Sequence, residues 1–513
     1  MLTTKKRVMD KKGNILFSSS AQEDPVTELW LQQQFTEPET HRGFGPLSAE
    51  PLQVSTKTRE EGITLALRQG PFYRRFKILF PPEIWKACPE QLKTAIRNNI
   101  AFLSSMELGV TFSLPQINYD TPFPELKSAF RELLFNLLLF DAHADQKKTD
   151  EYLRRFANTT YTFSETAPPK AESWNTKERS INTMTFGKES LVSFGLAEEL
   201  GLRPQLVTIS EPDWNVIYRN QHFRTFECKH KEHLIREFEA EFDVKIHNVH
   251  NGLGDLRFYG HWDIDETEMG WNSQLTEFLL LLTPFNSFYN SRYMIFGHEQ
   301  SCNDVYVNKD GFRYNPFYDQ SSEWIRHMSA MLHTITNGST QALSLVQPLH
   351  EIAVSRILYQ RYPQLAKYQM SCHLDNDGAE KNRWCNNCSK CALCFIFMKA
   401  LGFDPAAVGL KELLSLKSKK LYPLFSNYVP QAERKADEPH EDEQLLAFFL
   451  ATERGVKGEL MELFKEKFYA EAKEREAELK ETYFGVHEPK NIPASLWKKI
   501  KPIYEEELGK ENE

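Results

Sequence analysis

The sequence predicts an α/β fold: a doubly wound parallel sheet with an α+β N-terminal domain and a C-terminal helical extension. Apolar, strand-like runs alternate with helix-length segments between residues 181 and 297, which is the pattern of parallel βαβ units. A hairpin pattern precedes this region. With 513 residues, the chain is also too long for one ordinary core, so we expect several domains.

The N-terminal part of the chain changes character near residue 60. Residues 1–60 are rich in Ser, Thr, Glu, Gln and Pro with little periodicity, which predicts an extended or disordered arm. Residues 61–172 are predicted to form the α+β domain. Apolar and polar residues alternate around a Gln-Gly-Pro turn, which predicts a hairpin over residues 62–80. Helical periodicity follows over residues 84–106 and 123–146.

Residues 173–430 are predicted to form a nucleotide-binding domain that also carries a cysteine motif. Its strands are expected at residues 181–186, 204–210, 243–249 and 291–297, with helices between them. The carboxyl ends of such parallel strands meet at one edge of the sheet, where ligands bind. Residues 431–513 are predicted to form the helical extension, whose acidic helix we interpret as a solvated surface.

The turn after the first of these strands is a candidate phosphate site. Residues 183–190, TMTFGKES, lead from the strand through a glycine, a lysine and a hydroxyl directly into a helical pattern. Such a turn points the first backbone N–H groups of the helix at the group above it, which is usually an anion. The alternative is an ordinary connection between a strand and a helix.

The cysteines form a second candidate site. Five of the eight lie between residues 372 and 394. Their repeated C-x2-C spacing predicts a tetrahedral metal site with Cys372, Cys385, Cys388 and Cys391 as ligands. Cys394 continues into an apolar helix, where a small buried thiol is expected. We favour Zn²⁺ over an iron–sulfur cluster, and a structural role, because four thiolates leave no open position on the metal.

Composition excludes several functional classes. The net charge is −9, and no Lys/Arg stripe is present, which argues against nucleic-acid binding. No apolar run approaches the about 20 residues that cross a bilayer. The first residues also lack the apolar segment of a signal peptide. We therefore expect a cytoplasmic protein that acts on a small molecule, with neither nucleic acid nor membrane as a partner. The oligomeric state is left open.

The order of these motifs resembles the PP-loop (N-type) ATP pyrophosphatase superfamily, whose turn usually reads S-G-G-x-D-S. Within it, the chain is most similar to the ATP-dependent UDP-N-acetylmuramoyl-L-alanyl-L-glutamate epimerase family. The resemblance covers about residues 180–400 and rests on FGKESLV (186–192), FGHEQS (296–301), YNPFYDQSSEW (314–324), VQPLHEIAVSRIL (346–358) and the cysteine motif (371–391). It implies a PP-loop type of sheet that binds ATP at the turn.

The resemblance also implies roles for single residues. The residues that would hold the ATP phosphates and the accompanying Mg²⁺ are Thr185, Gly187, Lys188, Glu189 and Ser190. Two positions depart from the usual pattern. Phe186 stands where glycine is usual, and it adds a side chain where the backbone should approach phosphate closely. Glu189 stands where aspartate is usual and is one methylene longer. Either departure can alter nucleotide binding.

The reaction that the resemblance implies is an epimerisation in peptidoglycan precursor synthesis. ATP would adenylate the terminal L-Glu carboxylate of a nucleotide-sugar peptide, UDP-N-acetylmuramoyl-L-Ala-L-Glu, and the product would be the D-Glu epimer, AMP and pyrophosphate. Adenylation removes the carboxylate charge beside Cα, so that the Cα proton can leave. His298, Glu299 and Cys302 are the candidates for proton transfer.

Further candidates and two alternative functions remain. Glu351 and Arg356, in a predicted helix, could contact a substrate phosphate or carboxylate. The expected cofactors are ATP, Mg²⁺ and a structural Zn²⁺. One alternative is another PP-loop enzyme of the 7-cyano-7-deazaguanine synthase type, which activates a carboxylate or amide for attack by ammonia. The other is a non-catalytic nucleotide-binding module.

Overall fold

The computed structural model describes residues 8–9, 15–16, 50–211, 223–257, 270–271, 273–372, 382–433 and 441–509. The chain divides into two compact units, Met1–Arg42 and Gly43–Glu513. In the first unit, strand β1 (Val8–Met9) pairs antiparallel with β2 (Ile15–Leu16). The second unit contains the three domains predicted after residue 60, and all candidate site residues belong to it.

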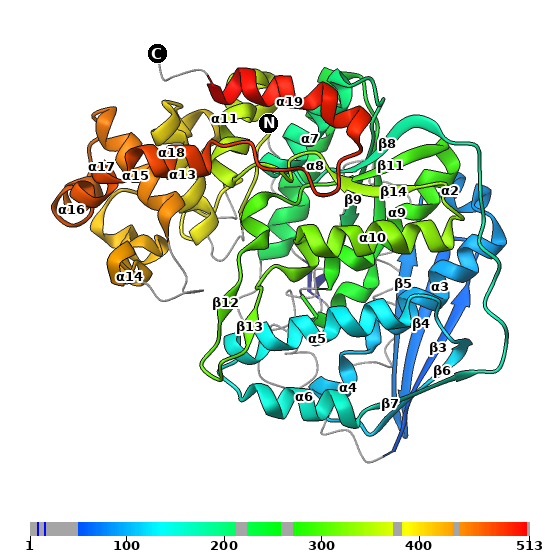
Figure 1. Ribbon diagram of the computed structural model, residues 1–513. Coiled ribbons are helices and arrows are strands. Elements are labelled where there is room, and N and C mark those ends of the chain that lie inside the picture. The colour runs from blue at the N-terminus through cyan, green and yellow to red at the C-terminus, as the bar shows by residue number, and fades with distance from the viewer. Residues whose placement is uncertain are drawn as a thin grey trace. The chain divides into compact units, whose positions relative to one another are not determined.

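A 10-stranded sheet lies at the centre of the second unit, in the order β14-β11-β8-β9-β10-β5-β4-β3-β6-β7 (Figure 1). Its strands are β3 (Leu52–Thr58), β4 (Gly62–Gln69), β5 (Phe72–Leu79), β6 (Gln116–Pro122), β7 (Thr160–Ser164), β8 (Lys177–Thr183), β9 (Gln205–Ser210), β10 (Ile246–Asn251), β11 (Ser291–Phe296) and β14 (Gln341–Ser344). From β14 to β10 all pairs are parallel. The pairs from β10 to β3 are antiparallel, and those from β3 to β7 are parallel. The predicted α/β class is confirmed, with a mostly parallel sheet.

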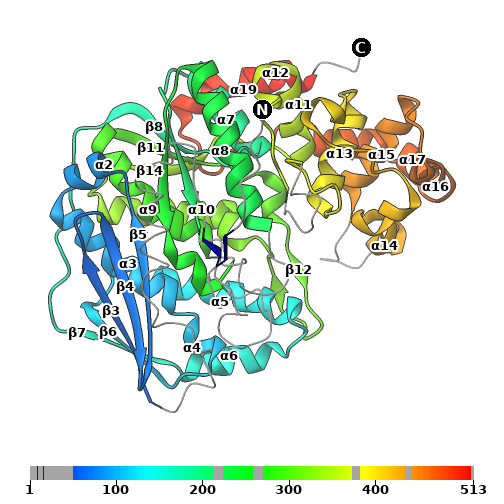
Figure 2. The same cartoon turned by 180° about the vertical axis from the view of Figure 1, so that it is seen from behind.

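Helices pack on both faces of this sheet, and the helices toward the C-terminus form a further group beside it; Figure 2 shows the chain from behind. The helices that the structure describes follow in chain order. They are α2 (Pro82–Ala87), α3 (Glu90–Ser105), α4 (Leu108–Thr111), α5 (Lys127–Ala144), α6 (Thr149–Asn158), α7 (Lys188–Glu199), α8 (Phe223–Phe242), α9 (Gln274–Tyr289), α10 (Ser322–Ile335), α11 (Glu351–Arg361), α12 (Pro363–Ala366), α13 (Ser389–Leu401), α14 (Leu424–Asn427), α15 (Asp442–Glu453), α16 (Glu459–Lys467), α17 (Tyr469–Glu474), α18 (Glu476–Tyr483) and α19 (Ala494–Gly509). Short 3₁₀ turns include η2 (Gly252–Arg257), η4 (Gln300–Asn303) and η5 (Tyr318–Gln320), and a small ribbon pairs β12 (Tyr306–Val307) with β13 (Arg313–Tyr314).

The hairpin predicted over residues 62–80 is confirmed, because β4 pairs antiparallel with β5 along its whole length. β3 lies in the region predicted as an arm, residues 1–60. Its Leu52 and Val54 are buried and alternate with more exposed residues, which is the two-residue period of a half-buried strand. β5 also pairs with β10, so the predicted α+β and nucleotide-binding domains share one sheet.

The four strands predicted in the nucleotide-binding domain are present as β8, β9, β10 and β11, with ends shifted by a few residues. β8 ends at Thr183, three residues before the predicted end at Phe186, because the chain turns there into α7. The helix predicted over residues 84–106 is divided into α2 and α3. Pro89, which lies between them, has no N–H to continue the first helix.

The residues of β11 show why helices cover both faces of the sheet. Tyr293 and Ile295 point into a core formed with α7, α8 and α11. Met294 and Phe296 point into a second core, formed with α3, α5, α9 and α10. Both sides of the strand are therefore buried, as expected for a central parallel strand.

The order of the parallel strands reverses between β8 and β11. β8 comes first in the chain, β9 and β10 follow on one side of it, and β11 and β14 are added on the other. In open α/β sheets, ligands bind outside the carboxyl ends of the strands at such a reversal. The turn after β8 and the loop after β11 both begin at this point, so the fold brings two sequence-predicted segments together.

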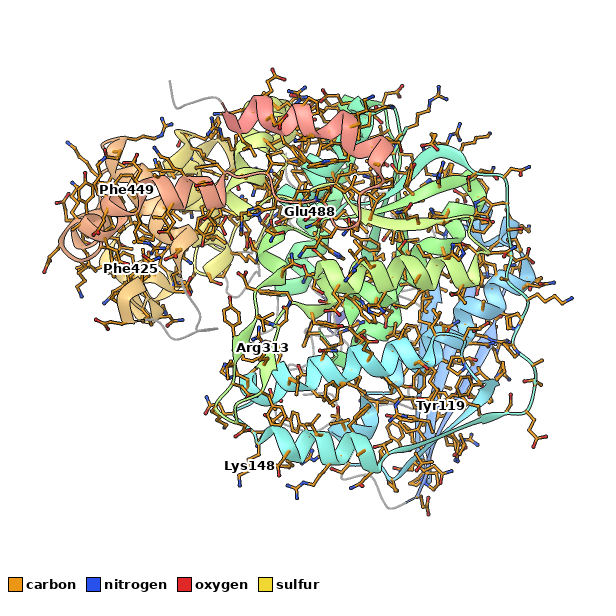
Figure 3. All side chains as sticks on the ribbon, viewed as in Figure 1. Tyr119, Lys148, Arg313, Phe425, Phe449 and Glu488 are labelled. Carbon is orange, nitrogen blue, oxygen red and sulfur yellow. The ribbon has the colours of Figure 1, made fainter. Side chains whose placement is uncertain are left out.

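The C-terminal helices α13, α15, α16, α17 and α18 pack on one another. Phe425 of α14 and Phe449 of α15 lie in this group (Figure 3). The segment with Glu488 connects α18 to α19, and the neighbouring His487 N–H donates to the Pro348 carbonyl, before α11, at 2.9 Å. Within the described part of the chain, none of the helices combines the length and apolar character needed to cross a bilayer.

Candidate functional site

The turn after β8 brings its polar residues together at the start of α7. Gly187 is the N-cap of that helix, and no side chain forms a capping hydrogen bond. The Ser190 hydroxyl donates to the Gly187 carbonyl at 2.9 Å. Thr185 Oγ1 accepts from the Gly187 N–H at 3.4 Å and lies 3.4 Å from Ser190 Oγ. The first N–H groups of a helix without a side-chain cap are suited to receive an anion.

Phe186 adopts the left-handed backbone conformation that is usually found at glycine. Its φ angle is +61°, in the left-handed region that favours glycine. The side chain is fully buried, and its ring packs edge-on against Phe238 with centroids 5.7 Å apart. The ring therefore points into the core with α7 and α8. Phe186 therefore departs from the usual glycine without changing the backbone conformation of the turn.

Replacing Phe186 with glycine should lower the free energy of unfolding by about 1–4 kcal/mol. Loss of a buried phenyl ring costs about 3–5 kcal/mol, and relief of the left-handed backbone returns about 1–2 kcal/mol. Urea denaturation measures the difference. Asn290→Gly is the matched control, because Asn290 has φ +54° at the end of α9, and its change should stay below about 1 kcal/mol. A Phe186→Gly protein as stable as the wild type would contradict the packing argument.

Lys188 lies among three carboxylates at the point where the strand order reverses. Its Nζ donates to Glu351 Oε2 at 2.7 Å, pairs closely with Glu189, and lies 3.9 Å from Glu299 Oε2. Glu189 follows it on α7, Glu299 is on the loop after β11, and Glu351 begins α11. One carboxylate oxygen from each lies within 4.8 Å of the others. We call Glu189, Glu299 and Glu351 the carboxylate cradle.

Close approach of two segments is needed to assemble the cradle. Gly297 ends the β11 segment, and a Cβ atom at this position would lie 2.6 Å from Glu189 Cβ. Only a glycine therefore lets the first turn of α7 lie against the start of the loop that carries Glu299. The sequence FGHEQS contains this glycine, but its purpose depends on α7, more than a hundred residues earlier.

Charges in and around the cradle perturb one another. Burial raises the pKa of Glu299 well above its ordinary value, and Lys188 offsets only part of this. For Glu351, burial acts in the same direction, but Lys188 and Lys390 outweigh it and lower the pKa to about 2. Burial alone would lower the pKa of Lys188, yet the three carboxylates raise it well above its ordinary value. The pKa values of Glu299 and Glu351 are therefore shifted in opposite directions.

Two further charged residues lie near the cradle, and sequence reasoning missed both. Lys390, in the first turn of α13, has a pKa raised chiefly by Glu351. Burial raises the pKa of Glu443, in the first turn of α15, to about 8, and its Oε1 accepts from the Ile352 N–H at 2.7 Å. No local signal marks them. Lys390 stands inside the cysteine motif, and Glu443 lies in an extension to which no function was assigned.

The other residues of the loop after β11 are buried close to Glu299 but outside the cradle. The ring of His298 stacks on Phe296 with centroids 5.3 Å apart, and neither ring nitrogen has a hydrogen-bond partner. Burial lowers the pKa of His298 to about 3, so the ring is neutral at neutral pH. Burial also raises the pKa of Cys302 well above its ordinary value. Cys302 is thus a thiol rather than a reactive thiolate.

Of the two candidates in α11, the structure places one in the cradle and the other outside it. Glu351 belongs to the cradle, whereas the Arg356 guanidinium lies over the ring of Phe484 at 5.3 Å and bonds Gln360 at 3.1 Å. The helix period explains this, because residues five positions apart on α11 do not share a face. Of these two candidates, Glu351 alone belongs to the cradle.

A second buried charge cluster lies at the carboxyl ends of β9 and β10. Arg257, at the end of η2, pairs with Glu211 at 2.7 Å and with Glu277 at 3.0 Å. Asn251 donates to Glu211 at 3.1 Å and also to Glu277. Arg257 forms buried ion pairs with both Glu211 and Glu277. We therefore interpret the cluster as a structural one that holds this edge of the sheet in place. Nothing in the local sequence around any of them predicts it.

The four predicted metal ligands lie together at the start of α13. Cys391 Sγ lies 3.5 Å from Cys388 Sγ, 3.5 Å from Cys372 Sγ and 3.8 Å from Cys385 Sγ. A tetrahedral Zn²⁺ with Zn–S bonds of about 2.3 Å requires S···S distances of about 3.8 Å. The geometry is therefore compatible with a structural zinc. Cys394 lies outside this group and accepts a hydrogen bond from Gln369 at 3.5 Å.

Comparisons with known proteins give no family assignment. No family model matches the chain, and no curated protein matches it. The function therefore has to be inferred from the motifs and from the geometry of the site.

Proposed function

We propose that this chain is an ATP-dependent epimerase that acts on the terminal L-Glu of UDP-N-acetylmuramoyl-L-Ala-L-Glu through an acyl-adenylate. The observation that carries the proposal is the position of Lys188 and the carboxylate cradle. Lys188 and Glu189 lie at the uncapped start of α7, and Glu299 and Glu351 approach them from the loop after β11 and from α11, at the reversal of strand order. The choice of substrate comes from the sequence resemblance, so this nucleotide-sugar peptide is the most specific part of the proposal.

The nucleotide is proposed to bind at the turn after β8. Backbone N–H groups at the start of α7 would receive the phosphates, and the Thr185 and Ser190 hydroxyls lie beside them. Lys188 supplies a positive charge at the same helix end. Mg²⁺ prefers carboxylate oxygens, which Glu189 and its neighbours in the cradle offer.

The chemistry is proposed to follow in four steps. A substrate carboxylate oxygen attacks the α-phosphorus, the bond to the β-phosphate breaks, and pyrophosphate leaves. The resulting acyl-adenylate lets a base remove the Cα proton, because the enolate no longer lies beside a carboxylate charge. A proton returns to the opposite face of Cα. Water then cleaves the mixed anhydride and releases AMP and the D-Glu product.

Three side chains are proposed for the proton transfers. Burial raises the pKa of Glu299, which makes this carboxyl group a stronger proton acceptor than an exposed glutamate. Cys302 is a thiol and suits the role of donor. His298 is neutral, and both of its ring nitrogens are free of hydrogen bonds. Since inversion needs groups on opposite faces of Cα, two of these residues would act together.

Solvent deuterium uptake tests the reaction. In deuterated water with the peptide substrate, ATP and Mg²⁺, the product should be the D-Glu epimer with deuterium at Cα, formed together with AMP and pyrophosphate. Glu299→Gln should reduce uptake by about a hundredfold or more. Glu323→Gln, in an exposed part of α10, is the control and should retain the wild-type rate. Deuterium uptake without ATP would refute the adenylation mechanism.

The cysteine site favours one alternative, because 7-cyano-7-deazaguanine synthases have a similar cysteine knuckle. In that case AMP formation would be accompanied by incorporation of ammonia into the substrate. A chain that binds ATP but forms no AMP with either type of substrate would be the non-catalytic nucleotide-binding module. The same assay thus separates the three functions by their products.

A further inference from the structure

The ammonium group of Lys188 occupies the position of a bound cation. It is 3% exposed, pairs with two members of the carboxylate cradle, and lies 3.9 Å from the third. Three carboxylates around one lysine have more acceptor oxygens than its three N–H groups can satisfy. Glu299 Oε2 receives no hydrogen bond, although Glu299 is only 6% exposed. This buried orphan oxygen faces the same centre as the ammonium.

The cradle also has the composition and spacing of a divalent-cation site. Its three ligand oxygens lie within 4.8 Å of one another, and octahedral Mg²⁺ with bonds of about 2.1 Å places adjacent ligands about 3.0 Å apart and opposite ligands about 4.2 Å apart. A small closing movement of the side chains would therefore bring all three to one ion. The ion and the ammonium cannot share this position, because both are cations and the space is buried.

A phosphate bound at the turn would give Lys188 a further anionic partner. It is the first residue of α7, next to the turn proposed to hold phosphate. Its side chain is a flexible four-carbon stem with a compact charge, so it can turn from a carboxylate to a phosphate without movement of the backbone. The helix end would hold that phosphate within reach of the same lysine.

We propose that Lys188 is an exchangeable internal cation, which holds the carboxylate cradle until nucleotide phosphates draw it away and a divalent cation takes its place. This inference rests on the proposed nucleotide site and specifies the order of binding there. Nucleotide and metal then raise each other's affinity by the same factor, as linkage requires. The free chain binds the divalent ion weakly, because the ion has to displace an ammonium that is already paired.

Mn²⁺ binding to the whole 513-residue chain, purified with whatever metal its cysteine site retains, tests this exchange. Without nucleotide, Lys188→Met should bind one Mn²⁺ at least about tenfold more tightly than the wild type, because the cradle is then unoccupied. Adding Glu299→Gln and Glu351→Gln should abolish the gain. Lys367→Met is the matched control, since Lys367 pairs with Glu241 on the surface and its loss should leave Mn²⁺ affinity unchanged. A folded Lys188→Met protein without the gain would overturn the proposal.

A second measurement uses the wild-type chain, in case the variant fails to fold. A non-hydrolysable ATP analogue should raise its Mn²⁺ affinity at least about tenfold, and unchanged affinity with bound analogue would overturn the exchange. The two proposals fail differently. If the wild type binds no nucleotide but Lys188→Met binds Mn²⁺ more tightly than the wild type, the cradle is a cation site and the proposed nucleotide function is refuted. If nucleotide binds and the Mn²⁺ affinity of neither protein rises, only the proposed exchange is refuted.

Discussion

Replacing Arg257 with methionine should lower the free energy of unfolding by about 3–5 kcal/mol, because the change leaves buried carboxylates without their cation. Arg257 pairs with Glu211 and Glu277, and the side chains of all three are at most 6% exposed. Its Nε also donates to the Gly270 carbonyl at 2.9 Å. Methionine fills a similar volume but restores none of these contacts. Urea denaturation at pH 7 measures the loss.

The loss should shrink as the pH falls, and this distinguishes a charge effect from a packing effect. Burial raises the pKa of Glu277 and Arg257 opposes this rise, so without the arginine the pKa of Glu277 rises further, and protonation at lower pH removes a buried charge that the variant leaves unpaired. Burial already raises the pKa of nearby Glu107 to about 7, and the stability that this group contributes is present at low pH and lost as the pH rises toward 7. A difference between wild type and variant that is equal at pH 5 and pH 7 would contradict the electrostatic explanation.

An exposed arginine provides the control for this experiment. Arg154 pairs with Asp150 one helical turn away at 2.7 Å, and their side chains are 70% and 61% exposed. Arg154→Met should therefore change stability by less than about 0.5 kcal/mol. A loss as large as that of Arg257→Met would mean that removal of any arginine destabilises the chain.

Replacing Cys388 with serine should remove the metal and destabilise the chain by about 4 kcal/mol or more, the range associated with loss of a structural metal. Cys388 is the N-cap of α13, its Sγ accepts from the Cys391 N–H at 3.4 Å, and it lies within the group of four cysteines. Loss of the metal would free α13 from the loop that carries Cys372 and Cys385. Elemental analysis and thermal unfolding measure the two effects.

Cys394→Ala is the matched control for the metal site. Cys394 lies three residues beyond Cys391 on α13 but outside the cluster. The control should keep a stoichiometric metal and lose only a small packing contribution. A wild-type chain purified without zinc or iron, or a folded and equally stable Cys388→Ser protein, would exclude a structural metal. The element found would also decide between zinc and an iron–sulfur cluster.

Local patterns predicted much of the fold, because the information lies within short windows. Alternating and apolar runs located β4, β5, β9 and β11, and the spacing of the cysteines identified the four thiols that the structure brings together. The boundary errors have local causes as well. The chain turns at Phe186 in a left-handed conformation that only glycine would have signalled. β3 was missed although its Leu52 and Val54 keep the two-residue period, because polar residues dominate the region around this strand.

The candidate site was predictable only in part. Residues of the turn and of the loop after β11 could be named, since each follows a predicted strand. Glu351 could be named only as a possible substrate contact in a helix, and neither its pairing with Lys188 nor the nearby Glu443 could be predicted. Lys188 and Glu351 are 163 residues apart, and Glu443 lies a further 92 residues along the chain. A glutamate at the start of a helix is common on protein surfaces, so neither residue has a signature of its own.

The sequence by itself predicted most of the strands and helices, the four thiols that lie together, and the turn that resembles a phosphate site. Only the tertiary structure decided that β10 joins β5 and so makes one mixed sheet, that Lys188 lies within the carboxylate cradle, and that Arg257 joins two carboxylates. The physical reason is the distance along the chain over which each kind of interaction acts. Periodicity and ligand spacing act between residues a few positions apart, whereas buried ion pairs depend on the order of strands. That order is set by packing of the whole sheet against its two cores.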